Sequence, residues 1–301
     1  MKRFIYNNHK VGSSSLYTFT THTFTNCSIT GINGPTLGQM QTAYSSYSWT
    51  QNTAFFNLGS YQGYQKWTVP KTGTYRFDIT GAKGGQSTAY GVDFGGLGVR
   101  AQADITLTQG EYIIIAVGQM GTNQLYGGGG GGSTFVVRST GNVPLLIAGA
   151  GGGAYVYVDN RASYSDASTT VTSKSCSGTQ STFGGGGGGG FYGAGESHTY
   201  SPPYGGGGGG FNTGLVGGAG YATYAGDGGF GGGGGGEWNY YGSGGGGGGY
   251  SGGCNRGDGY GGYAGANGQG GGGSYYIGSA TNVTMTASYN SGHGYVSVTK
   301  L

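Results

Sequence analysis

Apolar and polar residues alternate in short segments of this chain, a period typical of β-strands with one buried face. Residues 99–108 (VRAQADITLT) alternate along their length, and residues 111–118 (EYIIIAVG) form an apolar run that we expect to be buried. Gln109 and Gly110 between them are a turn signal. By the same criteria, strands are predicted at residues 18–25, 65–69, 75–80, 99–108, 111–118, 134–138, 143–148, 282–288 and 294–299.

Turn residues and the lack of helical periodicity narrow the fold class. Residues 70–73 (PKTG) and 140–142 (TGN) separate predicted strands with residues that favour tight turns. No segment keeps the period of an α-helix, so we expect very little helix. Short strands at this spacing predict an all-β fold, an antiparallel β-sandwich or jelly roll.

Sequence complexity changes twice along the chain. Residues 1–180 have ordinary complexity and contain the first glycine run, residues 181–274 are dominated by glycine runs, and residues 275–301 are strand-like again. We therefore predict a β-sandwich over residues 1–180, an inserted glycine-rich bundle over 181–274, and C-terminal strands over 275–301 that complete the sandwich.

Composition excludes several classes of protein. Glycine supplies 79 of the 301 residues and tyrosine 27, whereas Lys and Arg together number 13 and Asp and Glu 10. Collagen is excluded because glycine does not recur at every third position and proline numbers 5. A net charge of +3 provides no basic stripe, so we expect no nucleic-acid partner. No apolar run is long enough to span a bilayer, so we expect no membrane insertion.

Uninterrupted glycine occurs in six runs, at residues 127–132, 184–190, 205–210, 231–236, 244–249 and 270–273. A flexible linker is one interpretation, but aromatic residues bound the runs and favour an ordered one. A polyproline-II-type helix made of glycine has three residues per turn and no internal hydrogen bonds, so its backbone must bond to neighbours. Ordering each glycine costs about 0.5–1 kcal/mol more than ordering alanine, so only a laterally bonded bundle would be stable.

Motifs in the first half of the chain occur in a recognisable order, with GINGPT at 31–36, QKWTVP at 65–70, GAKGG at 81–85 and PLLIA at 144–148. Together they resemble the glycine-rich domain of the anaplastic lymphoma kinase and leukocyte tyrosine kinase receptors, and related glycine-rich proteins of bacteria and their viruses. The resemblance implies a tumour-necrosis-factor-like β-sandwich with an inserted polyglycine-II helix bundle. We do not expect the receptors' transmembrane segment and kinase in this chain. Met40 stands where a second cysteine is usual, which leaves a disulfide from Cys27 unsupported.

The arrangement of loops between glycine runs is similar to that of the tail-tip adhesins of T-even-like phages, which implies loops that recognise bacterial surfaces. The candidate loops are residues 191–204, 211–230, 237–243 and 250–267. Tyrosine and tryptophan provide large contact area at small entropic cost. The candidate receptor-binding residues are Tyr200, Tyr204, Phe211, Tyr221, Tyr224, Trp238, Tyr240, Tyr241 and Tyr250. The alternative is that these aromatic residues cap the bundle or bury a subunit contact.

Cysteine and histidine patterns indicate no catalytic or metal site. Cys27, Cys176 and Cys254 are an odd set without a CxxC motif, which favours free thiols over a disulfide framework. The four histidines lack metal-ligand spacing, and no serine lies in a nucleophile elbow. We therefore predict that the protein is not an enzyme and needs neither cofactor nor metal.

These observations favour a virion structural protein, in a phage tail fibre or tail tip, that presents aromatic loops to a host receptor. The expected partners are a cell-surface glycan or outer-membrane protein, other virion or tail proteins, and two further copies in a homo-trimer. Lys2 and Arg3 begin like a signal peptide but no apolar segment follows, so we expect synthesis in the host cytoplasm and location in the virion.

Two other functions stay open. A secreted or surface-anchored structural or ligand-binding domain of a cell would be favoured by an upstream in-frame signal peptide. A low-complexity, phase-separating chain would usually carry many arginines, whereas residues 181–274 contain only Arg256.

Overall fold

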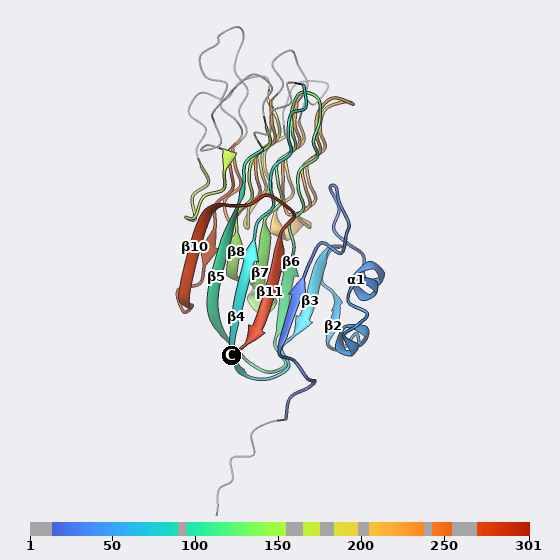
Figure 1. Cartoon of the computed structure of the whole chain (residues 1–301), viewed down its shortest axis with the longest axis vertical. Helices are drawn as coiled ribbons and strands as arrows, with labels where there is room; N and C mark the ends of the chain where they lie inside the picture. The colour runs from blue at the N-terminus through green and yellow to red at the C-terminus, as the bar shows by residue number, and fades with distance from the viewer. Residues whose placement is uncertain are drawn as a thin grey trace, which may run out of the picture.

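The computed structural model describes residues 14–89, 95–154, 165–174, 184–197, 205–237, 243–254 and 270–301. In these residues two antiparallel β-sheets pack face to face, and glycine-rich segments extend from one end of them (Figure 1). The prediction of an all-β sandwich is confirmed at this level. Among the described residues, no helix has the length and hydrophobicity needed to cross a bilayer.

The first sheet has five strands and joins the two ends of the chain. Its strands, in spatial order, are β1 (Thr21–Phe24), β11 (Tyr295–Lys300), β4 (Gly73–Thr80), β5 (Gly98–Leu107) and β10 (Thr281–Asn290). β11 lies between β1 and β4, so the last strand of the chain is an interior strand of this sheet. The outer face is polar, with cross-strand ion pairs between Arg76 and Asp104 and between Arg100 and Asp78.

The second sheet has six strands and is covered on both faces. Its strands, in spatial order, are β2 (Phe56–Leu58), β3 (Tyr64–Thr68), β6 (Tyr112–Ala116), β7 (Thr134–Arg138), β8 (Val143–Ala148) and β9 (Tyr275–Tyr276). Burial on both faces explains the apolar runs of β6, β7 and β8, since successive side chains point to opposite sides of a sheet.

Helical structure is confined to short segments in the described residues. Four of them have bounds within the described residues, and these are α1 (Leu37–Ala43) and the 3-10 helices η1 (Ser48–Gln51), η2 (Thr140–Asn142) and η3 (Phe211–Thr213). α1 begins after Thr36, whose hydroxyl accepts from the Gln39 N–H while the Gln39 side chain accepts from the Thr36 N–H. This capping box satisfies two backbone donors at the helix start.

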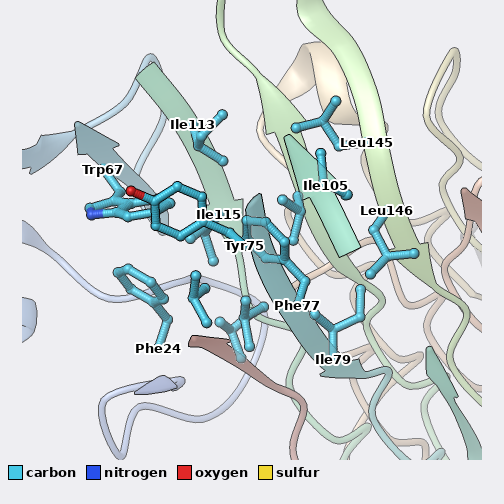
Figure 2. Packing of buried hydrophobic residues seen from close by; sticks show 14 of the residues in the cluster. Phe24, Trp67, Tyr75, Phe77, Ile79, Ile105, Ile113, Ile115, Leu145 and Leu146 are labelled. Carbon is cyan, nitrogen blue, oxygen red and sulfur yellow. The ribbon is translucent and has the colours of Figure 1, made fainter. Parts of the chain in front are cut away.

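Large apolar side chains from both sheets fill the space between them (Figure 2). Trp67 and Ile115 come from the six-stranded sheet and Tyr75 and Phe77 from the five-stranded sheet, and all four are fully buried. Burial of a side chain of this size contributes about 1.5–3 kcal/mol. This core fixes the two sheets that position the glycine-rich segments.

Candidate functional site

The strands of the sandwich continue directly into glycine-rich segments at one end (Figure 1). β4, β6 and β8 lead into residues 81–85, 118–122 and 149–154, and runs 127–132 and 270–273 lead into β7 and β9. Further segments bond beside these extensions. We call the whole set the glycine array, made of the six glycine runs and of residues 81–85, 118–122, 149–154, 193–196, 215–220 and 225–230.

Backbone hydrogen bonds in the array repeat every three residues. In run 127–132, the N–H groups of residues 128 and 131 donate to segment 149–154, and those of 129 and 132 donate to segment 118–122. The N–H of Gly130 donates to the carbonyl of Gly234 at 2.8 Å. The carbonyls of the run accept from three other segments, which are 81–85, 225–230 and 244–249. One run therefore bonds to six neighbours, which satisfies its backbone polar groups in a buried position.

Runs 231–236 and 244–249 are bonded in the same way, each to six neighbouring segments. Their glycines are all buried. A Cβ atom at Gly130 would fall on the carbonyl oxygen of Gly246, and one at Gly245 on that of Gly234. The runs lie so close together that no larger residue fits at these positions without moving a backbone segment.

The ends of the runs nearest the sheets carry aromatic residues that pack on the outer face of the six-stranded sheet. Five rings follow one another with centroids 5.0, 5.0, 6.1 and 4.6 Å apart. We call this set the aromatic row, which consists of Tyr64, Phe211, Phe191, Tyr250 and Tyr275. The row joins β3 to β9 and attaches the array to the sandwich.

Two of the predicted receptor-binding residues belong to this row. Phe211 is 3% exposed and stacks on Tyr64, whose hydroxyl donates to the Phe211 carbonyl. Tyr250 is partly buried, and its hydrogen bond with Tyr192 raises the pKa of Tyr250 to about 12. The structure thus gives Phe211 a packing position, which is the alternative that the sequence left open for these aromatic residues.

Two other predicted residues lie at the opposite end of the array. Tyr221 follows segment 215–220 and is partly buried, whereas Tyr224 is 44% exposed. The ring of Tyr126 meets that of Tyr224 edge to face at 6.0 Å, and the Tyr126 N–H donates to the Tyr224 carbonyl at 3.2 Å. Leu125 beside them is 36% exposed. Tyr126 and Leu125 were not predicted, although Tyr126 bounds a glycine run just as the predicted residues do.

Backbone hydrogen bonds hold three loops together around these side chains. We call this surface the tip, made of residues 86–89, 122–126 and 221–224. The Ala89 N–H donates to the Leu125 carbonyl at 2.9 Å. Asp227 accepts twice, from the Thr122 N–H at its carbonyl (2.9 Å) and from the Gly220 N–H at its carboxylate (2.7 Å). The tip is therefore a connected framework.

The charges near the tip are acidic in the part of the chain that the structure describes. Asp227 is exposed, and Glu237 is buried beside the start of run 127–132. Residues 86–89, 122–126, 219–227, 236–237 and 243 contain no lysine or arginine. The described tip therefore offers aromatic faces and hydrogen-bonding groups without a cationic group.

The remaining predicted residues lie outside the described residues, and these are Tyr200, Tyr204, Trp238, Tyr240 and Tyr241. Glu237 and Ser243, the described residues next to three of them, belong to the tip end of the array. The Glu237 N–H donates to the Ser243 carbonyl at 2.7 Å.

The cysteines correct the prediction of free thiols. Cys254 is disulfide-bonded, whereas Cys27 is free and buried, and burial raises the pKa of its thiol. Cys176 lies outside the described residues. The odd number of cysteines and the missing CxxC motif gave no indication of this disulfide. Over the ranges that the structure describes, no three His, Cys, Asp or Glu side chains gather in a metal-type cluster.

A 107-residue stretch, 35% of the chain, is 36% identical to the leukocyte tyrosine kinase receptor of Mus musculus. This stretch spans 12% of the length of that receptor. No family model matches the chain. The similarity supports the relation to this receptor family that the sequence motifs predicted, over about a third of the chain.

Proposed function

We propose that this protein is a non-enzymatic structural component of a virion, in a phage tail fibre or tail tip, that attaches to a host surface. The observation that carries the proposal is the position of Tyr126 and Tyr224, a partly exposed aromatic pair at the end of the array farthest from the sheets. The receptor is a glycan or an outer-membrane protein, and other tail proteins hold the sandwich.

The scaffold in this proposal is a polyglycine-II bundle inserted in a tumour-necrosis-factor-like sandwich. Hydrogen bonds that repeat every three residues support the bundle, because this helix has three residues per turn. Six neighbours around a run support side-by-side packing of parallel rods. The tumour-necrosis-factor-like topology is proposed from the resemblance and from two packed antiparallel sheets. A homo-trimer is proposed with it, and light scattering of the purified protein measures its mass.

A rigid scaffold suits attachment for a thermodynamic reason. Binding loses less conformational entropy when the contact residues are already ordered. The tip loops are bonded to one another and to Asp227, so Tyr126 and Tyr224 keep their positions before a partner arrives. Tyrosines held in this way provide contact area and a hydroxyl for hydrogen bonding.

Adsorption of the phage to its host tests the proposal. An antibody against the protein should label the tail in electron micrographs, and purified protein should block adsorption. The double variant Tyr126→Ser/Tyr224→Ser should lose the block. Tyr289→Ser is the matched control, because Tyr289 on β10 is 47% exposed and lies outside the tip. Unlabelled virions, or an equal block by both variants, would contradict the attachment function.

A secreted or surface-anchored ligand-binding domain is the second candidate. The similarity to a receptor and the disulfide at Cys254 favour it, because disulfides persist in oxidising, extracellular environments. Mass spectrometry of the N-terminal peptide of the native protein separates the two candidates. A peptide that begins after a cleaved signal sequence would support the cellular domain.

A further inference from the structure

We propose that the tip binds an uncharged saccharide, an inference that rests on the attachment function proposed above and names its ligand class. The apolar C–H face of a sugar ring packs on an aromatic ring, while the sugar hydroxyls bond to polar groups at its edge. Tyr224 offers the aromatic surface, with Tyr126 edge to face against it and Leu125 beside them. Tyr224 and Leu125 are exposed and Tyr126 is partly exposed, so the tip presents apolar surface to solvent.

Polar groups on the tip loops and on the neighbouring Asp227 suit the hydroxyl groups of a sugar. Asp227 uses one carboxylate oxygen to accept from the Gly220 N–H, and a carboxylate keeps further acceptor sites. Asn123 is exposed, and its side-chain oxygen accepts from the Gln86 N–H at 2.8 Å, which directs its amide donors elsewhere. Thr88 and Thr223 are exposed hydroxyls on two of the tip loops. A sugar needs both donors and acceptors, and the tip supplies both.

Charge selects an uncharged sugar over an acidic one. An anionic ligand would meet the exposed carboxylate of Asp227, and the described tip has no lysine or arginine to balance it. Like charges that face each other across an interface repel and suppress the wrong partner. Phosphorylated, sulfated and carboxylated sugars are therefore disfavoured ligands.

The backbone of the tip is held in a conformation that favours a fixed binding surface. Ala222, between the two tyrosines of its loop, has φ of 54°, in the left-handed region that is strained for a residue with a Cβ. The bonds from Tyr126 to Tyr224 and from Tyr221 to Gly236 hold the loop in this conformation. Such strain persists where the surroundings over-determine the backbone, and it concentrates at ligand-binding sites.

Binding of the whole protein to a printed panel of neutral and acidic oligosaccharides tests the inference. We expect binding to neutral sugars that changes little between low and high salt, because no ion pair forms. Tyr224→Ala should weaken it about tenfold or more, in the range of interface hot spots, whereas Tyr224→Phe keeps the ring and should retain binding. Asp227→Asn should also weaken it, and Tyr289→Ala should not. Binding to acidic sugars alone would overturn the inference.

Host cells distinguish a wrong ligand from a wrong function. Periodate destroys surface sugars and proteinase K removes surface proteins, so labelled protein should bind protease-treated cells and not periodate-treated cells. Binding that survives periodate but not protease overturns the saccharide and leaves attachment intact. If the protein binds the printed oligosaccharides but does not bind untreated cells, the attachment function is contradicted and the saccharide site is supported.

Discussion

At the scale of single residues, His22 on β1 is buried without any polar contact to its ring in the described structure. It is 2% exposed, and neither ring nitrogen has a hydrogen-bond partner. Four aromatic rings meet the imidazole edge to face with centroids 4.6–5.0 Å away, and these belong to Phe24, Tyr44, Tyr47 and Trp49. Burial lowers the pKa of His22 from 6.5 to about 4. The folded protein therefore keeps this histidine neutral.

This shift predicts a loss of stability in acid. Below pH 6.5 the unfolded chain takes up a proton at His22 that the folded chain excludes until the pH falls to about 4. The free energy of unfolding should therefore decrease as the pH is lowered from 6.5 to about 4, by roughly 3 kcal/mol for His22 alone. Urea unfolding of wild type and His22→Phe at pH 7.5 and 4.5 measures it. The difference isolates His22, because His293, whose pKa burial also lowers, is common to both. Equal pH dependence in both proteins would exclude this origin.

One glycine in a crowded position and one in an open position should respond to substitution by alanine with opposite changes in stability. Gly130→Ala should destabilise the protein by about 1–3 kcal/mol or more, because its Cβ would meet the Gly246 carbonyl in a packed array. Gly38→Ala should stabilise it by about 0.5–1 kcal/mol, because Gly38 is exposed in α1 with open space around it. Denaturation midpoints of the two variants measure both effects. Similar midpoints would mean that run 127–132 tolerates a side chain.

The sequence analysis included Tyr224 among the candidate residues but not Tyr126, and it did not predict which end of the array each aromatic residue would occupy. Phe211 and Tyr224 both lie in loops between glycine runs, yet Phe211 packs against the sheet and Tyr224 is exposed at the tip. Segments that follow one another along the chain cross the array in opposite directions, and only some of these segments are glycine runs, so the side on which a loop falls depends on how many crossings precede it. That parity depends on the three-dimensional path, which composition and spacing do not encode.

At the scale of secondary-structure elements, strands were predictable because alternating apolar and polar residues indicate a strand with one buried face. All nine predicted segments overlap observed strands, and those for β7 and β8 have the observed bounds. β2 and β9 were not predicted, because three and two residues are too short to show a period. α1 was also missed, although Thr36 and Gln39 form a capping box that is visible in the sequence.

The aromatic row predicts how strongly the array is attached to the sandwich. Phe191→Ala should destabilise the protein by about 3–5 kcal/mol, because Phe191 is buried between the rings of Phe211 and Tyr250. Tyr192→Ala, one residue later, should cost no more than about 1 kcal/mol, because that side chain is 72% exposed. Guanidinium unfolding of both variants compares them. A small loss for Phe191→Ala would mean that the row does not hold the array.

At the scale of the whole molecule, the array is joined to the sandwich in two ways, through the continuous chain and through side-chain packing. The chain passes directly from β4, β6 and β8 into the array, and the aromatic row packs its near ends on the six-stranded sheet. Glycine has no side chain whose burial could stabilise the array, and each hydrogen bond makes a net contribution to stability of only about 1 kcal/mol. A bundle of such segments is stable only if its bonds form together on a preformed base, so we expect one cooperative unit rather than a folded sandwich with a loose appendage.

Hydrogen exchange measured by mass spectrometry tests this cooperativity. Peptides over residues 127–133 and 244–250 should be protected about as strongly as peptides over β6, because these amides are bonded and their glycines buried. The exposed turn at Gly278 should exchange rapidly in the same experiment. Gly130→Ala should lower protection in the array and in β7 together, since run 127–132 leads directly into β7. Glycine runs that exchange like an unstructured peptide beside a protected β6 would remove the rigid support on which the tip surface depends.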